Sequence, residues 1–418
     1  MLDGAEGPAR QKALDLLVRY GEALGAECFV DTTNIAGVPG SSTLFLQNYY
    51  QEHGGGSFED VFSRFDLDSD ETVPFPQVAG NCCHLQGGMD PELWTVQGMS
   101  REAFEHQQQD EAEVARHGIQ VLKTCTPYLA GNMPAYGEHC AWMESSAVVF
   151  CNSVVGGRTN TEGRESTSAA MITGKIPDWG FHRDEHRRGT HLIQADVPVE
   201  SVMDWGMLGY FIGDLVQENI PVLTGKLGQP DLIRHKHFGA AAASSGGVEM
   251  YHVVGVTPEA PSLEAALGSK KAVATIHYGA AERRRVYQSL NSNGSDSRVD
   301  YVMLGCPHAS IEQIGEAARL LAGRKIRTSL WLFTSRAVKT VADLNGYTKT
   351  ICDAGGLVMT DTCSAIGRTL PQGTKVVALD SAKQVHYLPA IMGIQAWFGS
   401  TDDCIRAALT GRWAGELR

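Results

Sequence analysis

Three short apolar runs decide the fold class of this chain: YVML at residues 301–304, LWLF at 330–333 and LVMT at 357–360. Helix-like segments separate them, from Ser310 to Ala322 and from Val341 to Ala354. Strands that alternate with helices in this way form a βαβαβ unit, and the strands of such a unit run parallel. The sequence therefore predicts an α/β protein built on parallel sheets.

A cysteine follows each of three predicted strands. Cys306 comes after 301–304, Cys363 comes after 357–360, and Cys125 comes after an earlier predicted strand at 119–123. Ligands of open α/β sheets bind beyond the carboxyl ends of the strands, so cysteines that are far apart in the sequence can become neighbours there. Three thiolates that leave one coordination position vacant suit an iron–sulfur cluster, whose unligated iron acts as a Lewis acid.

The other cysteines are expected to be structural. Adjacent residues such as Cys82, Cys83 and His84 cannot easily point at one metal ion, and their spacing matches no zinc motif. The five that remain lie in apolar or helical stretches and are expected in the core: Cys28, Cys140, Cys151, Cys352 and Cys404.

Length and composition describe an ordinary globular enzyme. With 418 residues the chain exceeds the size of a single core and should form two or three domains. Its net charge of −13 argues against nucleic acid or an anionic membrane as a partner, and the short runs Arg187-Arg188 and Arg283-Arg284-Arg285 are expected on solvated helix or loop faces. Because the sequence shows neither a membrane-spanning run nor a signal peptide, we expect a cytoplasmic protein with reduced thiols.

The N-terminal part of the chain also alternates helices and strands. We expect a helix from Pro8 to Leu24, a short strand at 28–30, a loop from Asp31 to Thr43 and a helix from Ser100 to His117. Three domains are expected: an N-terminal α/β lobe over residues 1–185, a middle lobe over 186–295 and a C-terminal βαβαβ lobe over 296–418.

A polar segment from Gly137 to Gly163 is a second candidate for chemistry. Glycine-rich turns offer backbone amides to an anion, and Arg158 could bind a carboxylate or phosphate through two parallel hydrogen bonds. Glu144 could do acid–base work. The apolar run 147–150 either separates two polar clusters of a site or is an ordinary strand with capped ends.

Several common mechanisms lack their usual motifs. The sequence has no G-x-G-x-x-G after a strand, no G-x-x-x-x-G-K-[ST], no H-E-x-x-H and no G-x-S-x-G. Nicotinamide-dependent transfer, P-loop chemistry, zincin hydrolysis and nucleophile-elbow esterase chemistry are therefore disfavoured. A hydrolase that uses Cys306 as nucleophile with His308 nearby stays open as an alternative.

Several runs together resemble the aconitase X family, a divergent branch of the aconitase superfamily. They are CTPYL at 125–129, GEH at 137–139, WMESSA at 142–147, GGRTN at 156–160, GCPH at 305–308, DTC at 361–363 and SAKQVHY at 381–387. The resemblance spans nearly the whole chain. It implies a dehydratase with three α/β lobes around a cleft, and an iron–sulfur cluster held by Cys125, Cys306 and Cys363.

The resemblance also implies a partner. Aconitase X enzymes need a small swivelling β/α domain, which is a separate small subunit in some members, and only about twenty residues follow Gly399 here. We therefore expect the chain to be a large subunit that lacks the swivel domain. In aconitase relatives a serine of the swivelling domain is the base, so part of the chemistry is expected on the partner. A cluster-binding subunit without turnover of its own stays an alternative.

Two hydroxy acids are substrates of the family, cis-3-hydroxy-L-proline and mevalonate 5-phosphate. In both reactions a proton leaves the carbon next to a carboxyl group and the β-hydroxyl departs, which requires a Lewis acid, a base and fixed donors for the carboxylate. Within the family, the enzyme that acts on mevalonate 5-phosphate belongs mainly to archaea. Ten cysteines and many glutamines are unusual for a hyperthermophile, because proteins of such organisms are usually poor in these thermolabile residues. We therefore expect cis-3-hydroxy-L-proline as substrate and Δ1-pyrroline-2-carboxylate as product, with mevalonate 5-phosphate as the alternative.

The resemblance and the polar segment together define the expected site residues. Catalytic roles are expected for Glu144, Ser145, Ser146 and Lys383. Substrate contacts are expected from Asn152, Ser153, Arg158, Thr159 and His308.

Overall fold

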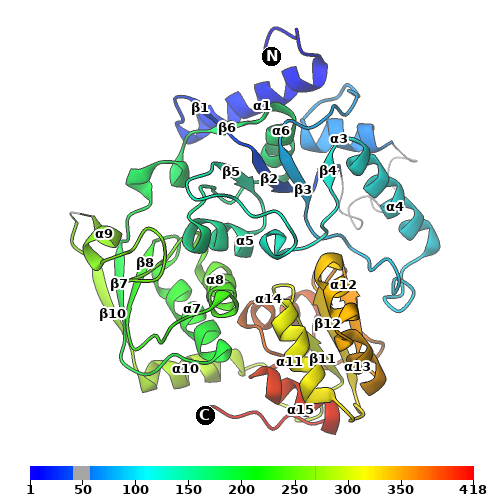
Figure 1. Ribbon diagram of the computed structural model, residues 1–418, viewed down its shortest axis with the longest axis vertical. Coiled ribbons are helices and arrows are strands. Elements are labelled where there is room, and N and C mark those ends of the chain that lie inside the picture. Colours follow the sequence, from blue (N-terminus) through cyan, green and yellow to red (C-terminus); the bar gives the residue numbers. More distant parts are fainter. Residues whose placement is uncertain (41–56, 269) are drawn as a thin grey trace. The chain divides into compact units, whose positions relative to one another are not determined.

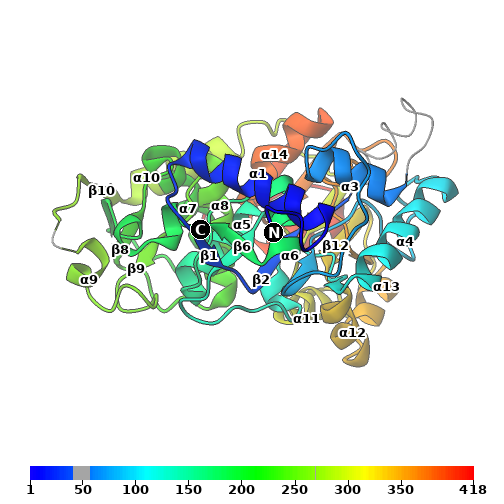
Figure 2. The same cartoon turned by 90° about the horizontal axis from the view of Figure 1, so that it is seen from above.

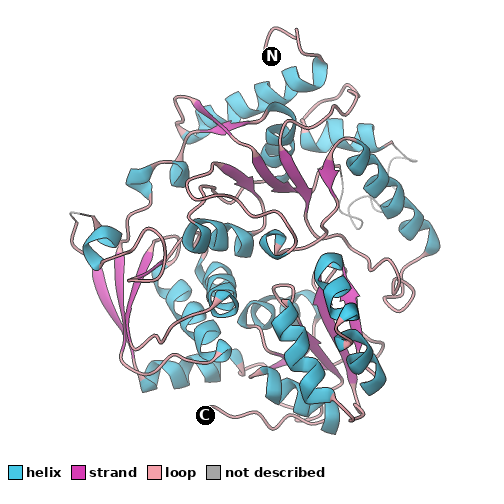
Figure 3. Ribbon diagram, viewed as in Figure 1, coloured by secondary structure: helices cyan, strands magenta, loops and turns pink. Residues whose placement is uncertain are grey.

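The computed structural model describes residues 1–40, 57–268 and 270–418. The chain forms two compact units, 1–187 and 188–418. The described residues form three larger sheets whose strands all run parallel, one in the first unit and two in the second (Figures 1 and 3). The expected α/β class with parallel sheets is therefore confirmed. The division of the second unit near residue 295 stays a prediction.

The sheet of the first unit has the strand order β4-β3-β2-β5. Its strands are β2 (Asn34–Gly37), β3 (Asn81–His84), β4 (Ile119–Gln120) and β5 (Cys140–Trp142). A small antiparallel pair, β1 (Phe29–Asp31) with β6 (Lys175–Pro177), accompanies it.

The expectation of a loop from Asp31 is wrong for residues 34–37, which form the inner strand β2. All four of these residues are buried. Because β2 consists of one polar residue and mostly small ones, its sequence shows no apolar run. Its burial on both faces is seen from two close contacts: the Asn34 side chain accepts a hydrogen bond from Trp142 Nε1 at 2.9 Å, and a Cβ at Gly37 would lie 2.4 Å from Thr167 Oγ1. Residues 41–43 of the expected loop lie outside the described residues.

Helices cover this first sheet. They are α1 (Pro8–Leu24), α3 (Phe58–Asp66), α4 (Arg101–Arg116) and α6 (Arg164–Thr173). The helix α1 packs on α6 (Figure 2). It ends at Gly25, whose φ of 73° is the left-handed conformation that glycine adopts without strain. The helices expected over 8–24 and 100–117 are thus confirmed.

The middle sheet, in the second unit, has the order β10-β7-β8-β9. Its strands are β7 (His191–Ala195), β8 (Pro221–Gly225), β9 (His252–Val253) and β10 (Ala274–Tyr278), with helices α7 (Val202–Val216), α8 (Leu232–Gly246), α9 (Leu263–Leu267) and α10 (Ala280–Leu290) between and after them. Helices α7 and α8 pack backbone against backbone. A Cβ at Gly213 would lie 2.4 Å from the Ala242 carbonyl oxygen, so this contact requires glycine.

The last sheet has the order β13-β12-β11-β14-β15. Its strands are β11 (Tyr301–Leu304), β12 (Ser329–Thr334), β13 (Leu357–Thr360), β14 (Val376–Leu379) and β15 (Gln395–Phe398), and its helices are α11 (Ile311–Leu321), α12 (Arg336–Leu344), α13 (Tyr347–Ala354), α14 (Ala382–Met392) and α15 (Thr401–Thr410). The predicted βαβαβ unit is confirmed with one change. The helix expected from Val341 to Ala354 is two helices, because the chain turns at Gly346, where φ is 72°.

In each of these sheets the order of strand addition reverses once. The first strand of each, β2, β7 or β11, lies between its successor and a strand added later from the other side. The loops after the two strands at such a reversal diverge, which leaves a crevice at the carboxyl edge of the sheet, where ligands of open α/β sheets bind.

Two cysteines differ from expectation: Cys28 and Cys352 are exposed rather than in the core. Both lie near element ends in amphipathic stretches, where a short apolar pattern does not tell the buried face from the exposed one. In the part of the chain that the structure describes, no helix combines the length and the apolar character needed to cross a membrane.

The close contact of α7 and α8 predicts opposite effects for two glycines of one helix. Gly213→Ala should destabilise the protein by about 1–3 kcal/mol, because the added methyl group meets the α8 backbone. Gly206→Ala is the matched control: apart from its chain neighbours and the backbone of its own helix, no atom lies within 4 Å of its added Cβ, so it should stabilise α7 by up to about 1 kcal/mol. Denaturant unfolding of both variants tests this, and equal effects would contradict the packing.

Candidate active site

Cys306 and Cys363 lie at the carboxyl edge of the last sheet, after β11 and β13. Gly305 has φ 85°, and a Cβ there would lie 2.1 Å from the Phe333 carbonyl oxygen, so the chain can turn sharply into Cys306 only with glycine at 305. The two cysteines are 7% and 6% exposed. Cys306 thus follows β11 at the strand reversal, and Lys383 lies in the first turn of α14 after the neighbouring strand β14.

Cys306, Cys363 and Lys383 follow β11, β13 and β14 of one parallel sheet, so all three lie at its carboxyl edge. Burial raises the pKa of the Cys363 thiol to about 12, and the Cys306 thiol adds to the rise. Backbone amides of Ile366 and Ala365 and the Lys383 ammonium oppose it. In the metal-free chain Cys363 is therefore a neutral thiol at neutral pH, and Lys383 is the nearby cation that favours its thiolate.

The side chains of His308 and Lys236 stabilise the turn that follows Cys306 through hydrogen bonds. The His308 ring is buried, and its Nε2 lies 2.9 Å from the Thr362 carbonyl oxygen, so it joins the two cysteine turns. Lys236 reaches the same turn from α8: its Nζ donates to the carbonyl oxygens of Pro307 at 3.2 Å and His308 at 2.8 Å, and also to Gln313 Oε1. Sequence reasoning did not find Lys236, since a lysine in a helix signals an exposed face.

Cys125 belongs to the first unit. Its strand, β4, is shorter than expected and ends at Gln120. Cys125 lies in the turn that precedes the short 3₁₀ helix η1 (Pro127–Leu129). The side chains of Thr124 and Thr126 are hydrogen-bonded to each other at 3.0 Å across Cys125. The Tyr128 ring stacks on Phe150 with a centroid separation of 3.8 Å, which joins the cysteine turn to the next helix.

The expected catalytic residues Glu144, Ser145 and Ser146 begin a helix at the strand reversal between β2 and β5. The run 147–150 is not a strand: α5 (Ser145–Phe150) continues directly into a π-helical turn, η2 (Cys151–Val155). Ser146 Oγ donates to Glu144 Oε1 at 3.0 Å. A π-helical turn inside a helix is uncommon and is frequent at functional sites, because the extra residue redirects neighbouring side chains.

Asn152, Ser153 and Thr159 are buried within the first unit. Asn152 Nδ2 donates to the Thr159 carbonyl oxygen at 2.8 Å, and the Thr159 amide donates to Asn152 Oδ1 at 3.1 Å. Ser153 lies in η2. The reciprocal pair fixes the glycine-rich turn 156–157 between these residues.

Arg187 completes this turn, and its expected solvated position is wrong. It is 1% exposed, and its Nη2 donates to the carbonyl oxygens of Asn152 at 3.1 Å and Gly157 at 3.0 Å. A two-residue basic run carries no sign of burial in the sequence. The guanidinium is buried because several carbonyl oxygens of one turn converge on it.

Arg158 points to the other side of the turn. Its Nη1 donates to the His182 carbonyl oxygen at 2.8 Å, and its Nη2 is ion-paired with Asp184. Next to it, His139 Nδ1 and His182 Nδ1 are 3.0 Å apart, and burial together with the His139 ring lowers the pKa of His182 to about 3. Arg158 therefore has protein partners on both of its terminal nitrogens, and a substrate contact through it stays a prediction.

Cys82 and Cys83 are buried in β3, and Asn132 Nδ2 donates to Cys83 Sγ at 3.0 Å. Burial raises the pKa of both thiols to about 12. Within the described ranges, no three His, Cys, Asp or Glu side chains lie together in a way that could hold a metal ion. Cys125 belongs to one compact unit and the Cys306–Cys363 pair to the other, so the three-thiol site stays a prediction.

The donor set does suit iron. Two nearly buried thiols at one sheet edge interact electrostatically, a lysine stands near them, and thiolate sulfur is the usual protein ligand of iron–sulfur clusters. The residues present therefore fit such a group.

Comparison with known proteins agrees with this geometry. Family models for the aconitase X first, second and third domains match residues 1–185, 189–288 and 299–410. The phosphomevalonate dehydratase large subunit of Methanocaldococcus jannaschii is 33% identical over 413 residues, 97% of either chain. The cis-3-hydroxy-L-proline dehydratase of Pseudomonas aeruginosa is 36% identical over 335 residues, which cover 78% of this chain and 57% of that protein.

A solved structure is similar throughout. The holo-form of aconitase X from Thermococcus kodakaraensis matches with a TM-score of 0.80 and 31% identity over 97% of both chains. The strand-end cysteines, the parallel sheets and these matches lead to one conclusion: the chain is a hydro-lyase that belongs to the aconitase X family.

Proposed function

We propose that this chain is the cluster-binding large subunit of a dehydratase that converts cis-3-hydroxy-L-proline into Δ1-pyrroline-2-carboxylate. The observation that supports the proposal is the position of Cys306, Cys363 and Lys383 after three parallel strands of one sheet, at its carboxyl edge. A hydrolase with Cys306 as nucleophile is less well supported, because His308 Nε2 contacts the Thr362 carbonyl oxygen.

Removal of water needs three groups that act on one substrate. A proton leaves the carbon next to the carboxylate, the β-hydroxyl departs, and the electron pair of the broken C–H bond forms the new double bond. Bound to Cys125, Cys306 and Cys363, an iron–sulfur cluster with one open iron position would supply the Lewis acid for the departing hydroxyl. In cis-3-hydroxy-L-proline the resulting enamine then isomerises to the imine product.

The chain's own residues would hold the substrate. Lys383 is assigned to the carboxylate, because it lies in the first turn of the helix after β14, at the same sheet edge as the cysteine pair, whereas Lys236 donates to backbone carbonyl oxygens. Ser145 and Ser146 offer hydroxyl groups at the start of α5, and the bond from Ser146 to Glu144 fixes one of them. The base at the α-carbon is assigned to a small partner subunit that closes the site and excludes water.

Mevalonate 5-phosphate is the second candidate substrate. One observation favours it: relatives named phosphomevalonate dehydratase large subunit align with this chain over nearly their full length, at 33% and 37% identity. The elimination has the same form, since its β-hydroxyl also lies next to the carbon that loses a proton.

The cluster assignment predicts which cysteines are needed for iron. Single substitutions Cys125→Ser, Cys306→Ser and Cys363→Ser should each lower bound iron and sulfide and bleach the visible absorption of anaerobically purified protein, because each removes one thiolate ligand. Cys352→Ser, at an exposed position of the last lobe, is the matched control and should keep both. Iron content that is unchanged in any of the three variants would remove that cysteine from the site.

The Lys236 contacts predict a positioning role. Lys236→Met keeps the length of the side chain but leaves the Pro307 and His308 carbonyl oxygens without this donor, which costs about 1–3 kcal/mol per buried group. The turn should loosen, so that Cys306 of the metal-free chain reacts faster with iodoacetamide and the holoprotein loses its cluster absorption sooner. Lys226→Met, at an exposed lysine of the same unit, is the control and should change neither rate.

The partner and the substrate are tested together. Alone, the chain should take up iron and sulfide yet turn over cis-3-hydroxy-L-proline at a rate near background, because the proposed base and the closing domain are absent. Addition of the small subunit should restore release of Δ1-pyrroline-2-carboxylate. Full activity of the isolated chain would contradict the large-subunit proposal. Activity of the pair on mevalonate 5-phosphate alone would reverse the choice of substrate.

A further inference from the structure

The strand reversal of the middle sheet carries a pocket that none of the expected site residues lines. Its volume is 690 Å³, within the range of about 300–1,000 Å³ that is typical of small-molecule sites. One wall is the segment after β7, with Pro198 and Asp204, and the other is the start of α10 after β10, with Ala280, Arg283 and Arg284. This is the crevice where an open α/β sheet binds ligands.

Arg283 is held in a fixed orientation in this pocket, and its side chain is only 22% exposed, although the run 283–285 is expected on a solvated face. Its Nε and Nη2 donate to Asp204 Oδ1 at 2.8 and 2.6 Å. The other oxygen of Asp204 accepts from Ser201 Oγ at 2.7 Å and from the Ser201 amide at 3.2 Å, which caps α7. Ser201 thus holds the Asp204 carboxylate in place, and the carboxylate in turn orients the Arg283 guanidinium. An arginine held in this way is preorganised to bind an oxygen of another group.

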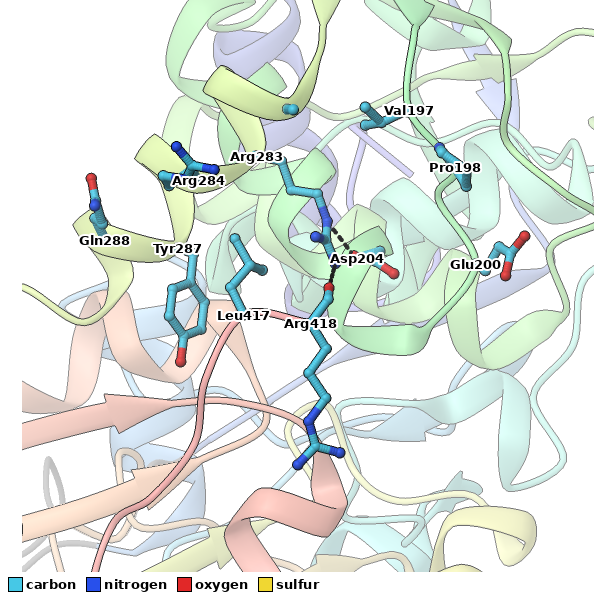
Figure 4. Close-up of a pocket in the computed structure, with 11 residues that line it drawn as sticks. Val197, Pro198, Glu200, Asp204, Arg283, Arg284, Tyr287, Gln288, Leu417 and Arg418 are labelled. Carbon is cyan, nitrogen blue, oxygen red and sulfur yellow. Dashed lines mark hydrogen bonds and ion pairs between the residues drawn. The ribbon is translucent and has the colours of Figure 1, made fainter.

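That further oxygen is already present in the structure. Arg283 Nη2 also donates to the main-chain oxygen of Arg418 at 2.6 Å, and Leu417 and Arg418 line the same pocket (Figure 4). The tail segment 417–418 therefore presents a main-chain oxygen to the arginine, in the place where an oxygen of a ligand would be bound. Arg284, the next residue on α10, is exposed at the pocket and adds a second positive charge.

We propose that this pocket is a second binding site, for a small organic anion whose carboxylate or phosphate oxygens replace the main-chain oxygen of Arg418 on Arg283. The pocket is lined by three arginines, Arg283, Arg284 and Arg418, and by the carboxylates of Asp204 and Glu200, so a ligand with one or two anionic groups is favoured over a polyanion. The site does not depend on the choice of substrate, because it shares no residue with the cysteine turns, α5 or α14.

Isothermal titration of the holoprotein with malonate and, separately, with pyrophosphate tests the proposal. At least one probe should bind with a sub-millimolar dissociation constant. Binding of malonate would indicate a carboxylate as the natural ligand group, and binding of pyrophosphate would indicate a phosphate. Binding should weaken at least tenfold in Arg283→Met, and less in Arg284→Met, because the first loses the oriented fork and the second only a charge at the edge. Ligand binding should also raise hydrogen exchange in the tail peptide 413–418, which is displaced.

Arg285→Met is the matched control. Arg285 lies on the same helix and is 67% exposed, but it does not line the pocket, so both probes should bind this variant as they bind the parent. If Arg283→Met does not fold because Asp204 loses its partner, Arg284→Met and Arg283→Lys carry the comparison. No binding of either probe, or equal loss in the Arg284 and Arg285 variants, would overturn the proposal.

Discussion

Parallel strands all end at the same edge of their sheet, and this constraint organises the chemistry of the whole chain. Each sheet adds strands first on one side and then on the other, so each has one place where the following loops diverge. The first of these reversals carries Glu144 and Ser146, the middle one carries the Arg283 pocket, and the last carries Cys306. One topological rule thus repeats three times with different side chains.

Buried cations shape the turns at these edges. Lys236 donates to two carbonyl oxygens after Cys306, and Arg187 donates to two carbonyl oxygens around η2. In both cases backbone carbonyl oxygens are among the acceptors, together with the side-chain amide of Gln313 for Lys236 and that of Asn152 for Arg187. A turn whose carbonyl oxygens point inward cannot be satisfied by water, so a long side chain from another element has to reach it. Each lysine or arginine therefore determines the course of a turn that carries functional residues.

The sequence predicted the features that local patterns encode. The strands before Cys306 and Cys363 were found because apolar runs end there in Gly-Cys-Pro and Asp-Thr-Cys. The strand β2 was missed because burial on both faces, and not hydrophobicity, makes Asn34 to Gly37 a strand. The helix at residues 147–150 was not recognised because all four residues are buried, which removes the periodic pattern that distinguishes helix from strand. Arg187 and Lys236 were missed because their acceptors are far away in the sequence.

The Lys236 contact has a consequence for the modular construction of the chain. Its helix α8 lies in the part that the second-domain model covers, whereas Pro307 and His308 lie in the part that the third-domain model covers. If the two parts were separated, both groups would be exposed to water and the turn after Cys306 would lose this support. A domain exchange in this chain would therefore keep the contact only if residues 232–246 and 305–313 came from the same parent.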